Sequence, residues 1–260
     1  KIIRTLHRTL LREDYAVYRT LPGGVQTSYV IHAGQYKTRP NSVITRYGDH
    51  FDYASPEETP ALMTDLVDWY NQTEQDSLLS PADLAILFHY RYIRIHPFED
   101  GNGRIARLLM KSILARHGYP MIVVRSRQKS DYLEALHKSD LKVGGDPSKG
   151  AKATLKQIKP FQKHMTDLMA HEIEMDTLFV TEKSEDIWWY DGQRIKFRTP
   201  TYGKILNELL SDYHPTYATL QKATGVNRSA LQKMIQNMTQ KGYIERDDEG
   251  GWRVFITSSM

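Results

Sequence analysis

The sequence predicts a mainly α-helical protein, in which a large helical domain with a small β-hairpin is followed by a smaller domain of helices and a hairpin. Three observations support this prediction. Long segments repeat apolar residues at helical spacing, short segments flank glycine-containing turns, and the last part of the chain follows the order of helices and then a hairpin. No apolar run reaches about 18 residues, so we expect no membrane-spanning helix and no membrane partner.

Composition agrees with a soluble globular protein. The 260 residues are enough for one large or two moderate domains, and 40% hydrophobic with 25% charged residues is an ordinary balance. The absence of cysteine excludes disulfides, cysteine-ligated zinc and cysteine nucleophiles, and it is compatible with the cytoplasmic location that we expect. The first residues carry charge but no long apolar core, so they do not resemble a signal peptide.

The pattern divides the chain into three parts. Residues 1–180 form the helical domain, residues 181–199 form a linker β-hairpin around an Asp-Gly turn, and residues 200–260 form the second domain. Near the end of the first part, residues 155–180 read as one long helix that Pro160 interrupts early.

Two helices and a hairpin are predicted around the middle of the first domain. Ser80 followed by proline indicates a helix start, and the largely apolar residues 84–95 continue that helix. A second helix is predicted from about 104 to 117 by apolar residues at helical spacing. Residues 42–53 alternate loosely about a turn and predict a β-hairpin, whereas residues 144–150 read as a loop.

The segment between the two helices collects groups that suit phosphoryl chemistry. His96 is a candidate general base, and Asp100 is a hard oxygen ligand of the kind that Mg²⁺ prefers. The Gly-Asn-Gly turn at 101–103 can aim backbone N–H groups at an anion, next to a helix N-terminus that favours negative charge. Arg104 and Arg107 supply planar cationic donors for phosphate oxygens.

Each of these features alone is more often structural than functional, because a Gly-Asn-Gly segment is usually only a turn and a single histidine usually forms a local hydrogen bond. Their combination argues for function. Nine specified residues in one frame recur by chance roughly once in 10¹² positions if each residue type has a frequency of about one in twenty.

Residues 96–107 read His-Pro-Phe-x-Asp-Gly-Asn-Gly-Arg-x-x-Arg, and this run resembles the signature of the Fic family at every specified position. The resemblance implies a Fic-type helical fold and a protein adenylyltransferase, which transfers AMP from ATP to a Ser, Thr or Tyr hydroxyl of a target protein and releases pyrophosphate. It implies that His96 deprotonates this hydroxyl and that Asp100 holds Mg²⁺. The implied nucleotide-binding set is Asp100, Gly101, Asn102, Gly103, Arg104, Ile105, Ala106, Arg107, Tyr132 and Asp140.

Other activities agree less well with the pattern. Kinase-like members of the family, the Doc toxins, depart from the signature at the second glycine and at the last arginine, whereas Gly103 and Arg107 are both present here. Two alternatives stay open. The Fic fold could serve as the ligand sensor of a transcription regulator, or the same site could remove AMP from a modified protein.

Two further regions resemble parts of Fic proteins. The hairpin over 42–53 resembles the flap that lies over the active site and pairs with the target backbone; an ordinary surface hairpin is the alternative. The flap residues nearest the nucleotide would be Gly48, Asp49, His50 and Phe51. Residues 132–136 resemble the adenosine-contacting helix, with Tyr132 against the base and Asp140 near the ribose. The family commonly has Asn in place of Asp140, and a core position for Tyr132 is the alternative.

Many Fic proteins carry an inhibitory helix, Ser/Thr-x-x-x-Glu-Gly/Asn, whose Glu pairs with the arginine that Arg107 matches. This pattern is absent from the sequence of residues 1–260. In one subgroup it lies just upstream of the region that residues 1–7 resemble, so we expect an inhibitory Glu before Lys1 in the natural protein.

The last part of the chain resembles a winged helix-turn-helix. Helices are predicted over 201–210, 216–224 and 228–240, followed by a hairpin around the acidic residues 247–249. Binding to DNA would use Asn227, Arg228, Ser229 and Gln232 for bases, and Lys222, Lys233 and Lys241 for phosphates. Residues 200–260 hold seven Lys and Arg against six Asp and Glu, so protein contact, including self-association into a homo-oligomer, is the favoured role.

Overall fold

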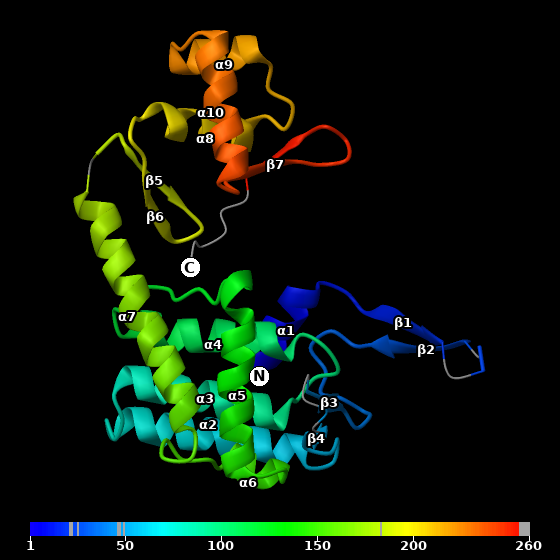
Figure 1. The fold of residues 1–260 in the computed structure, drawn as a ribbon. Coiled ribbons are helices and arrows are strands. Elements are labelled where there is room, and N and C mark those ends of the chain that lie inside the picture. Colours follow the sequence, from blue (N-terminus) through cyan, green and yellow to red (C-terminus); the bar gives the residue numbers. More distant parts are fainter. Residues whose placement is uncertain (21–22, 25, 46–47, 49, 183, 255–260) are drawn as a thin grey trace. The chain divides into compact units, whose positions relative to one another are not determined.

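The computed structural model describes residues 1–20, 23–24, 26–45, 48, 50–182 and 184–254. The chain forms two compact units, one from Lys1 to His171 and a second that starts at Glu172 (Figure 1). Within these described ranges, no helix is both long enough and apolar enough to cross a membrane. The domain boundaries near residues 180 and 199 stay predictions.

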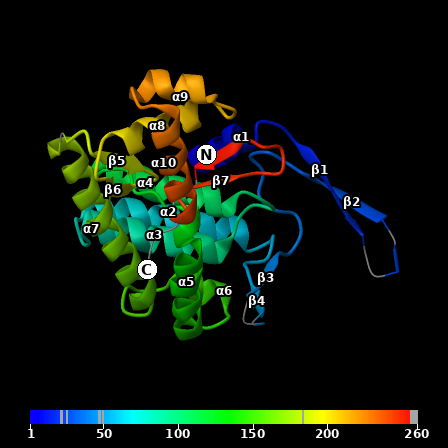
Figure 2. The same cartoon turned by 45° about the horizontal axis from the view of Figure 1, so that its top comes forward.

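The first unit is mainly helical, as predicted. Its two central helices, α3 and α4, contact each other and lie side by side in both views (Figures 1 and 2). A 3₁₀ turn, η1, precedes α5, and α7 continues into the second unit. The elements are α1 Ile2–Leu11, α2 Thr59–Gln75, α3 Pro81–Ile95, α4 Asn102–Arg116, η1 Ser126–Gln128, α5 Lys129–Val143, α6 Pro147–Ala151 and α7 Lys159–Thr181.

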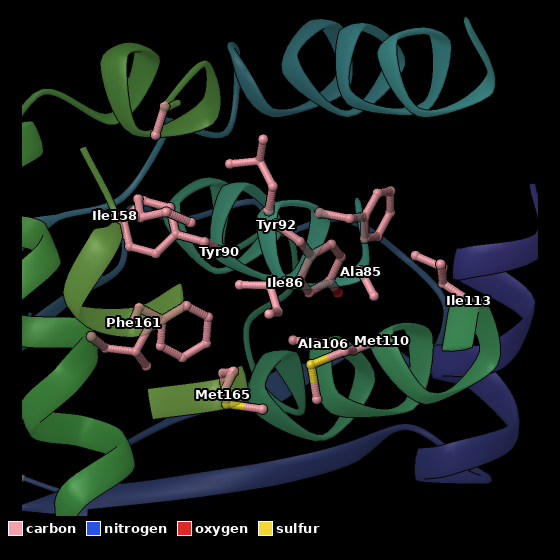
Figure 3. Close-up of a cluster of buried hydrophobic side chains, with 14 of the residues drawn as sticks. Ala85, Ile86, Tyr90, Tyr92, Ala106, Met110, Ile113, Ile158, Phe161 and Met165 are labelled. Atoms are coloured by element: carbon pink, nitrogen blue, oxygen red, sulfur yellow. The ribbon is translucent and has the colours of Figure 1, made fainter. Parts of the chain in front are cut away.

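The core of the first unit lies where α3 meets α4 and the start of α7 (Figure 3). Ile86 and Tyr90 come from α3, Ala106 and Met110 from α4, and Phe161 from α7, and all five are fully buried. Tight packing of this kind resists displacement of either central helix. The C-terminus of α3 and the N-terminus of α4 are therefore held at a fixed separation.

The predicted start of α3 is confirmed. The Ser80 side chain accepts a hydrogen bond from the backbone N–H of Asp83 at 3.1 Å, and proline occupies the first turn. Helix α4 begins at Asn102, two residues before its predicted start, because Gly101 adopts the left-handed conformation that precedes the helix, with φ 78°.

Two antiparallel hairpins belong to the first unit. Strand β3, Ser42–Ile44, pairs with β4, His50–Asp52, which confirms the predicted hairpin. Strand β1, Tyr15–Thr20, pairs with β2, Gln26–Ile31, and this hairpin was not predicted. Its signal is present in the sequence, because two segments rich in Tyr, Val and Thr flank a Gly-Gly pair.

Two sequence predictions at the end of this unit are wrong. Helix α7 starts at Lys159, so Pro160 lies in its first turn and does not interrupt it. A proline fits there because the N–H groups of the first turn have no helical partner. The segment 144–150, expected to be a loop, contains the start of α6. The Asp146 side chain begins this helix by accepting a hydrogen bond from the backbone of Ser148 at 2.9 Å.

The second unit confirms the predicted order of a hairpin, three helices and a wing. Trp188 of the hairpin packs in the same core as Ile205 and Leu231, and its indole N–H donates to the Asn207 side chain at 2.8 Å. The elements after α7 are β5 Ile187–Tyr190, β6 Gln193–Lys196, α8 Thr201–Ser211, α9 Tyr217–Thr224, α10 Arg228–Gln240, β7 Ile244–Arg246 and β8 Trp252–Val254.

A buried ion pair joins α3 to α5 in the first unit. The Arg94 guanidinium is only 2% exposed and donates to Asp140 at 3.0 Å and to the Gly144 carbonyl at 2.8 Å. Gly150 of α6 packs directly against the Arg94 side chain, where an added Cβ atom would lie 2.7 Å from the arginine Cβ. Glycine is therefore required at this position by close packing.

We predict that Gly150→Ala destabilises the protein by about 1–3 kcal/mol, the usual cost of overpacking a core. Gly145→Ala is the matched control, because an added Cβ meets nothing within 4 Å there, and its effect should stay within about 0.5 kcal/mol. Calorimetric unfolding of the full chain measures both. Equal unfolding midpoints for the two variants would contradict the packing argument.

Candidate active site

His96 ends α3 and turns the chain toward α4. Its backbone N–H donates to the Tyr92 carbonyl at 3.0 Å, and its φ of 52° and ψ of 59° are left-handed. The imidazole is half-buried and lies against the Tyr53 ring, with the ring centres 3.8 Å apart. A left-handed residue other than glycine costs about 1–2 kcal/mol, so its surroundings must hold this conformation.

The environment of His96 favours the neutral ring. Burial lowers the pKa of His96 to about 3, and the nearby Lys37 ammonium acts in the same direction. Asp100 and the Ile93 backbone oppose this shift without reversing it. The buried Nδ1 atom has no hydrogen-bond partner of ordinary geometry within the described part of the chain. At neutral pH the imidazole is therefore in the form that can accept a proton.

Asp100 lies at the start of the turn into α4, with its carboxylate partly exposed. Its Oδ2 atom accepts hydrogen bonds from the Tyr15 hydroxyl at 2.6 Å and from the Arg104 guanidinium at 2.8 Å. Burial alone would raise the pKa of Asp100, but hydrogen bonds from Tyr15 and the Gly101 backbone, together with the Arg104 charge, lower it overall. The carboxylate is therefore ionised, as a metal ligand must be.

The side chain of Asn102 holds the turn between the two helices. Its Oδ1 atom accepts from the Phe98 N–H at 2.9 Å, and its Nδ2 atom donates to the Phe98 carbonyl at 2.7 Å. Both Asn102 and Phe98 are buried. Ile105 and Ala106 are also fully buried, and the Ile105 N–H already donates to the Gly101 carbonyl at 3.0 Å. The backbone N–H groups that can face an anion at the start of α4 are therefore those of residues 102–104.

The two arginines of the motif have different surroundings. Arg104 is half-exposed and forms an ion pair with Asp100 across one helical turn. Arg107 is half-buried beside Gly103, whose added Cβ would lie 3.4 Å from the arginine Nη1 atom. The Arg107 charge also opposes the rise that burial causes in the pKa of Tyr132.

His7 of α1 contacts the turn between α3 and α4. Its role was not recognised from the sequence. The Gly34 N–H donates to its Nδ1 atom at 2.8 Å, which leaves the proton on Nε2 to donate to the Asp100 carbonyl at 3.0 Å. Its ring stacks on Phe98 with the ring centres 3.7 Å apart. A buried, neutral histidine therefore connects α1 to the turn.

The β3–β4 hairpin forms one wall of a cavity of about 220 Å³, whose other walls come from α3 and α5. Phe51 is buried and meets the His137 ring edge-on at 6.2 Å, which fastens the hairpin to α5. His50 is exposed, and Gly48 has a left-handed φ of 87°. The expected flap residue Asp49 lies outside the described residues.

The structure places the two expected adenosine contacts in different settings. Tyr132 is 3% exposed, and its hydroxyl lies 3.0 Å from Nε2 of His89, which favours the alternative of a core aromatic. Asp140 lines the cavity, but its Oδ1 atom already accepts from the Tyr90 hydroxyl at 2.7 Å and from Arg94 at 3.0 Å. A role for either residue in binding adenosine stays a prediction.

Several residues that contact the site were not identified from the sequence. Tyr15 reaches Asp100 from 85 positions away, and Tyr53 lies against His96. Asn41 donates to the Phe98 carbonyl at 3.0 Å. These contacts are set by the tertiary fold, so only the strand-like pattern around Tyr15 could have been read beforehand.

Comparison with known proteins agrees with this geometry. Residues 1–114 match the Fic/DOC family model, and residues 200–245 match a winged helix-turn-helix DNA-binding model. The crystal structure of a Fic domain-containing signalling protein from Bacteroides thetaiotaomicron shares 50% identity and a TM-score of 0.62, covering 70% of this chain and 63% of that one.

Curated relatives are named protein adenylyltransferase Fic. That of Nematostella vectensis is 37% identical over 113 residues, which are 44% of this chain and 25% of the relative. That of Drosophila sechellia is 43% identical over 182 residues, 70% of this chain and 31% of the relative. The chain thus spans less than a third of the length of either relative. These matches show that the chain carries an N-terminal Fic/DOC family domain followed by a winged helix-turn-helix domain.

Proposed function

We propose that the protein is an adenylyltransferase that transfers AMP from ATP to a Ser, Thr or Tyr hydroxyl of a target protein. The observation that supports this most is the placement of a neutral imidazole, His96, just before a helix N-terminus that is lined by Asp100 and the motif arginines. The names of the curated relatives point to the same activity. A cytoplasmic location stays a prediction.

The reaction uses the chain's groups in separate roles. The acceptor oxygen forms a bond to the α-phosphorus while the bond from that phosphorus to the bridging oxygen of the β-phosphate breaks, and pyrophosphate leaves with the electron pair. The proton of the acceptor passes to His96. Backbone N–H groups at the start of α4, with Arg104 and Arg107, stabilise the negative charge that the phosphates carry.

The donor set at Asp100 fits Mg²⁺ bound together with a nucleotide. Among the described residues, no three His, Asp or Glu side chains gather into a metal site. Mg²⁺ commonly binds through one or two carboxylates with phosphate oxygens and water, and one ionised carboxylate is what Asp100 provides. When bound, the ion would offset charge on the phosphates. Arg104 would then have to share or give up its contact with Asp100.

The β3–β4 hairpin is suited to hold the target chain. Its strands pair only with each other within the described residues, so each keeps an outer backbone edge. An extended target segment could add to such an edge through main-chain hydrogen bonds. Buried Phe51 packs the hairpin against α5, whereas the side chains of β3 are exposed.

Labelled ATP distinguishes this activity from its alternatives. The full chain is incubated with a cell lysate and with ATP labelled at the α- or at the γ-phosphate. AMP transfer labels protein only from the α-position, whereas phosphorylation labels it only from the γ-position. A ligand sensor binds ATP without labelling protein, and an AMP-removing enzyme releases AMP from protein labelled beforehand.

We predict that His96→Ala reduces α-label transfer by about 10²–10⁴-fold, the usual contribution of a general base. The dissociation constant for ATP should change little, because the groups proposed to bind the phosphates do not include the imidazole. His171→Ala on the exposed face of α7 is the control. Transfer above a tenth of the wild-type rate in the His96 variant would exclude its role as the base.

We predict that Asp100→Ala removes the Mg²⁺-dependent part of ATP affinity, about tenfold or more, together with transfer activity. Titration calorimetry with and without Mg²⁺ measures this effect. Asp65→Ala on α2 is the control, because its carboxylate is exposed and lies 3.8 Å from the exposed Lys152 ammonium. An unchanged gain in ATP affinity on adding Mg²⁺ would refute the assignment of Asp100.

A specific observation supports a second function, binding of duplex DNA by the winged helix-turn-helix. Residues 213–244 contain no Asp or Glu, so the acidic residues of this unit lie outside the α9–α10 pair. The cations of this acid-free segment are exposed: Lys222, Arg228, Lys233 and Lys241. The Asn227 side chain begins α10, because its Oδ1 atom accepts from the Ala230 N–H at 2.9 Å. Its Nδ2 group is the part that can still donate to a base.

We predict that the full chain binds duplex DNA with an affinity that falls as salt rises. Combining Lys222→Ala with Lys233→Ala should reduce the slope of log affinity against log salt by about 2, since each phosphate contact contributes about 0.9. Lys204→Ala on the exposed face of α8 should leave the slope unchanged. Fluorescence anisotropy gives the slopes, and equal slopes for all proteins would refute this second function.

A further inference from the structure

Lys37 is a buried lysine that contacts the backbone on both sides of His96. The residue is only 3% exposed. Its ammonium donates to the Ile95 carbonyl at 3.2 Å and to the Asn41 side chain at 2.7 Å. Its backbone N–H donates to the Pro97 carbonyl at 2.9 Å. One residue thus binds the carbonyl groups immediately before and immediately after His96.

Asn41 completes this pattern. Its Nδ2 atom donates to the Phe98 carbonyl at 3.0 Å and approaches the His96 carbonyl at 3.5 Å. Its own carbonyl accepts from the N–H of Tyr53, the residue whose ring lies against the imidazole. Four consecutive carbonyls, from Ile95 to Phe98, therefore have a donor from Lys37 or Asn41, which we call the Lys37–Asn41 brace.

We propose that the Lys37–Asn41 brace is a positioning device for His96, which holds its left-handed backbone so that the imidazole stays aimed at the acceptor hydroxyl. This inference rests on the proposed adenylyltransferase function. The strained residue needs contacts that hold it, and the brace fixes the carbonyls on either side of it. General-base catalysis depends on such placement, because a displacement of about 1 Å can cost about 10²-fold in rate.

The chemistry of Lys37 supports a role beyond packing. A buried charge is a costly way to stabilise a fold, and an apolar side chain of similar size often serves as well. Burial lowers the pKa of Lys37 to about 8, so its ammonium stays largely charged at neutral pH. The same charge disfavours protonation of His96. Lys37 therefore donates hydrogen bonds to the loop, and its charge favours the neutral form of the His96 ring.

The test compares Lys37→Met, Lys37→Arg and the exposed control Lys163→Met in the full chain. We expect Lys37→Met to lower the initial rate of α-label transfer by about 10–10²-fold, with the dissociation constant for ATP changed by less than about twofold. Lys37→Arg keeps the charge and the donors, so it should recover part of the rate. A folded Lys37→Met protein with the wild-type rate would overturn the proposal.

A second variant and a nucleotide-free measurement keep the test decisive. If Lys37→Met does not fold, Asn41→Ala takes its place. We expect the same loss of transfer rate, and a folded Asn41→Ala protein with the wild-type rate would likewise overturn the proposal. The NMR resonances of the His96 ring, recorded without ATP, should move in the brace variant and not in Lys163→Met. If the wild type transfers no label, the proposed function fails, and these resonances still decide whether the brace positions His96. An unmoved His96 spectrum would refute it.

Discussion

The left-handed backbone of His96 is the constraint on which the rest of the site depends. It ends α3 and lets the chain reach the start of α4 within six residues, from His96 to Gly101. Because this conformation is strained, neighbouring contacts must hold it. Asn102 binds both backbone groups of Phe98, His7 binds the Asp100 carbonyl, and the Lys37–Asn41 brace binds the carbonyls around His96.

The same geometry gives two groups of the motif opposite electrostatic roles. His96 is enclosed by Tyr53 and lies near a cation, so burial dominates and its ring stays neutral. Asp100 is more exposed and receives hydrogen bonds, so its pKa falls despite partial burial and it stays ionised. A side chain that can accept a proton and one that can bind a cation are therefore both in the required state at the same pH, only four residues apart in the chain.

Much of the fold could be predicted from the sequence because its determinants are local. Ser80 and the following proline mark the start of α3, and apolar spacing marks α4 and α10. The motif likewise predicted which residues would gather at the turn. The supports of that turn were not predictable, because His7, Tyr15 and Asn41 reach it only through tertiary contacts. The burial of Tyr132 is also a property of packing, which no local pattern reports.

Charge in the second unit shows why a sum over a domain can mislead. The acidic residues of 200–260 lie in α8, just after it and in the wing, so the near-balanced total of this segment conceals an α9–α10 pair that carries only cations. Part of the acidity of the wing is also structural. Asp247 accepts from the N–H groups of Glu249 and Gly251 at 3.1 and 2.9 Å and pairs with Arg253 at 3.5 Å. The negative charge of Asp247 is largely neutralised by these contacts within the turn. Asp247 should therefore repel a polyanion bound to α10 less than a count of acidic residues implies. A polyanion that contacts α10 with the wing tip turned away would meet a field of one sign.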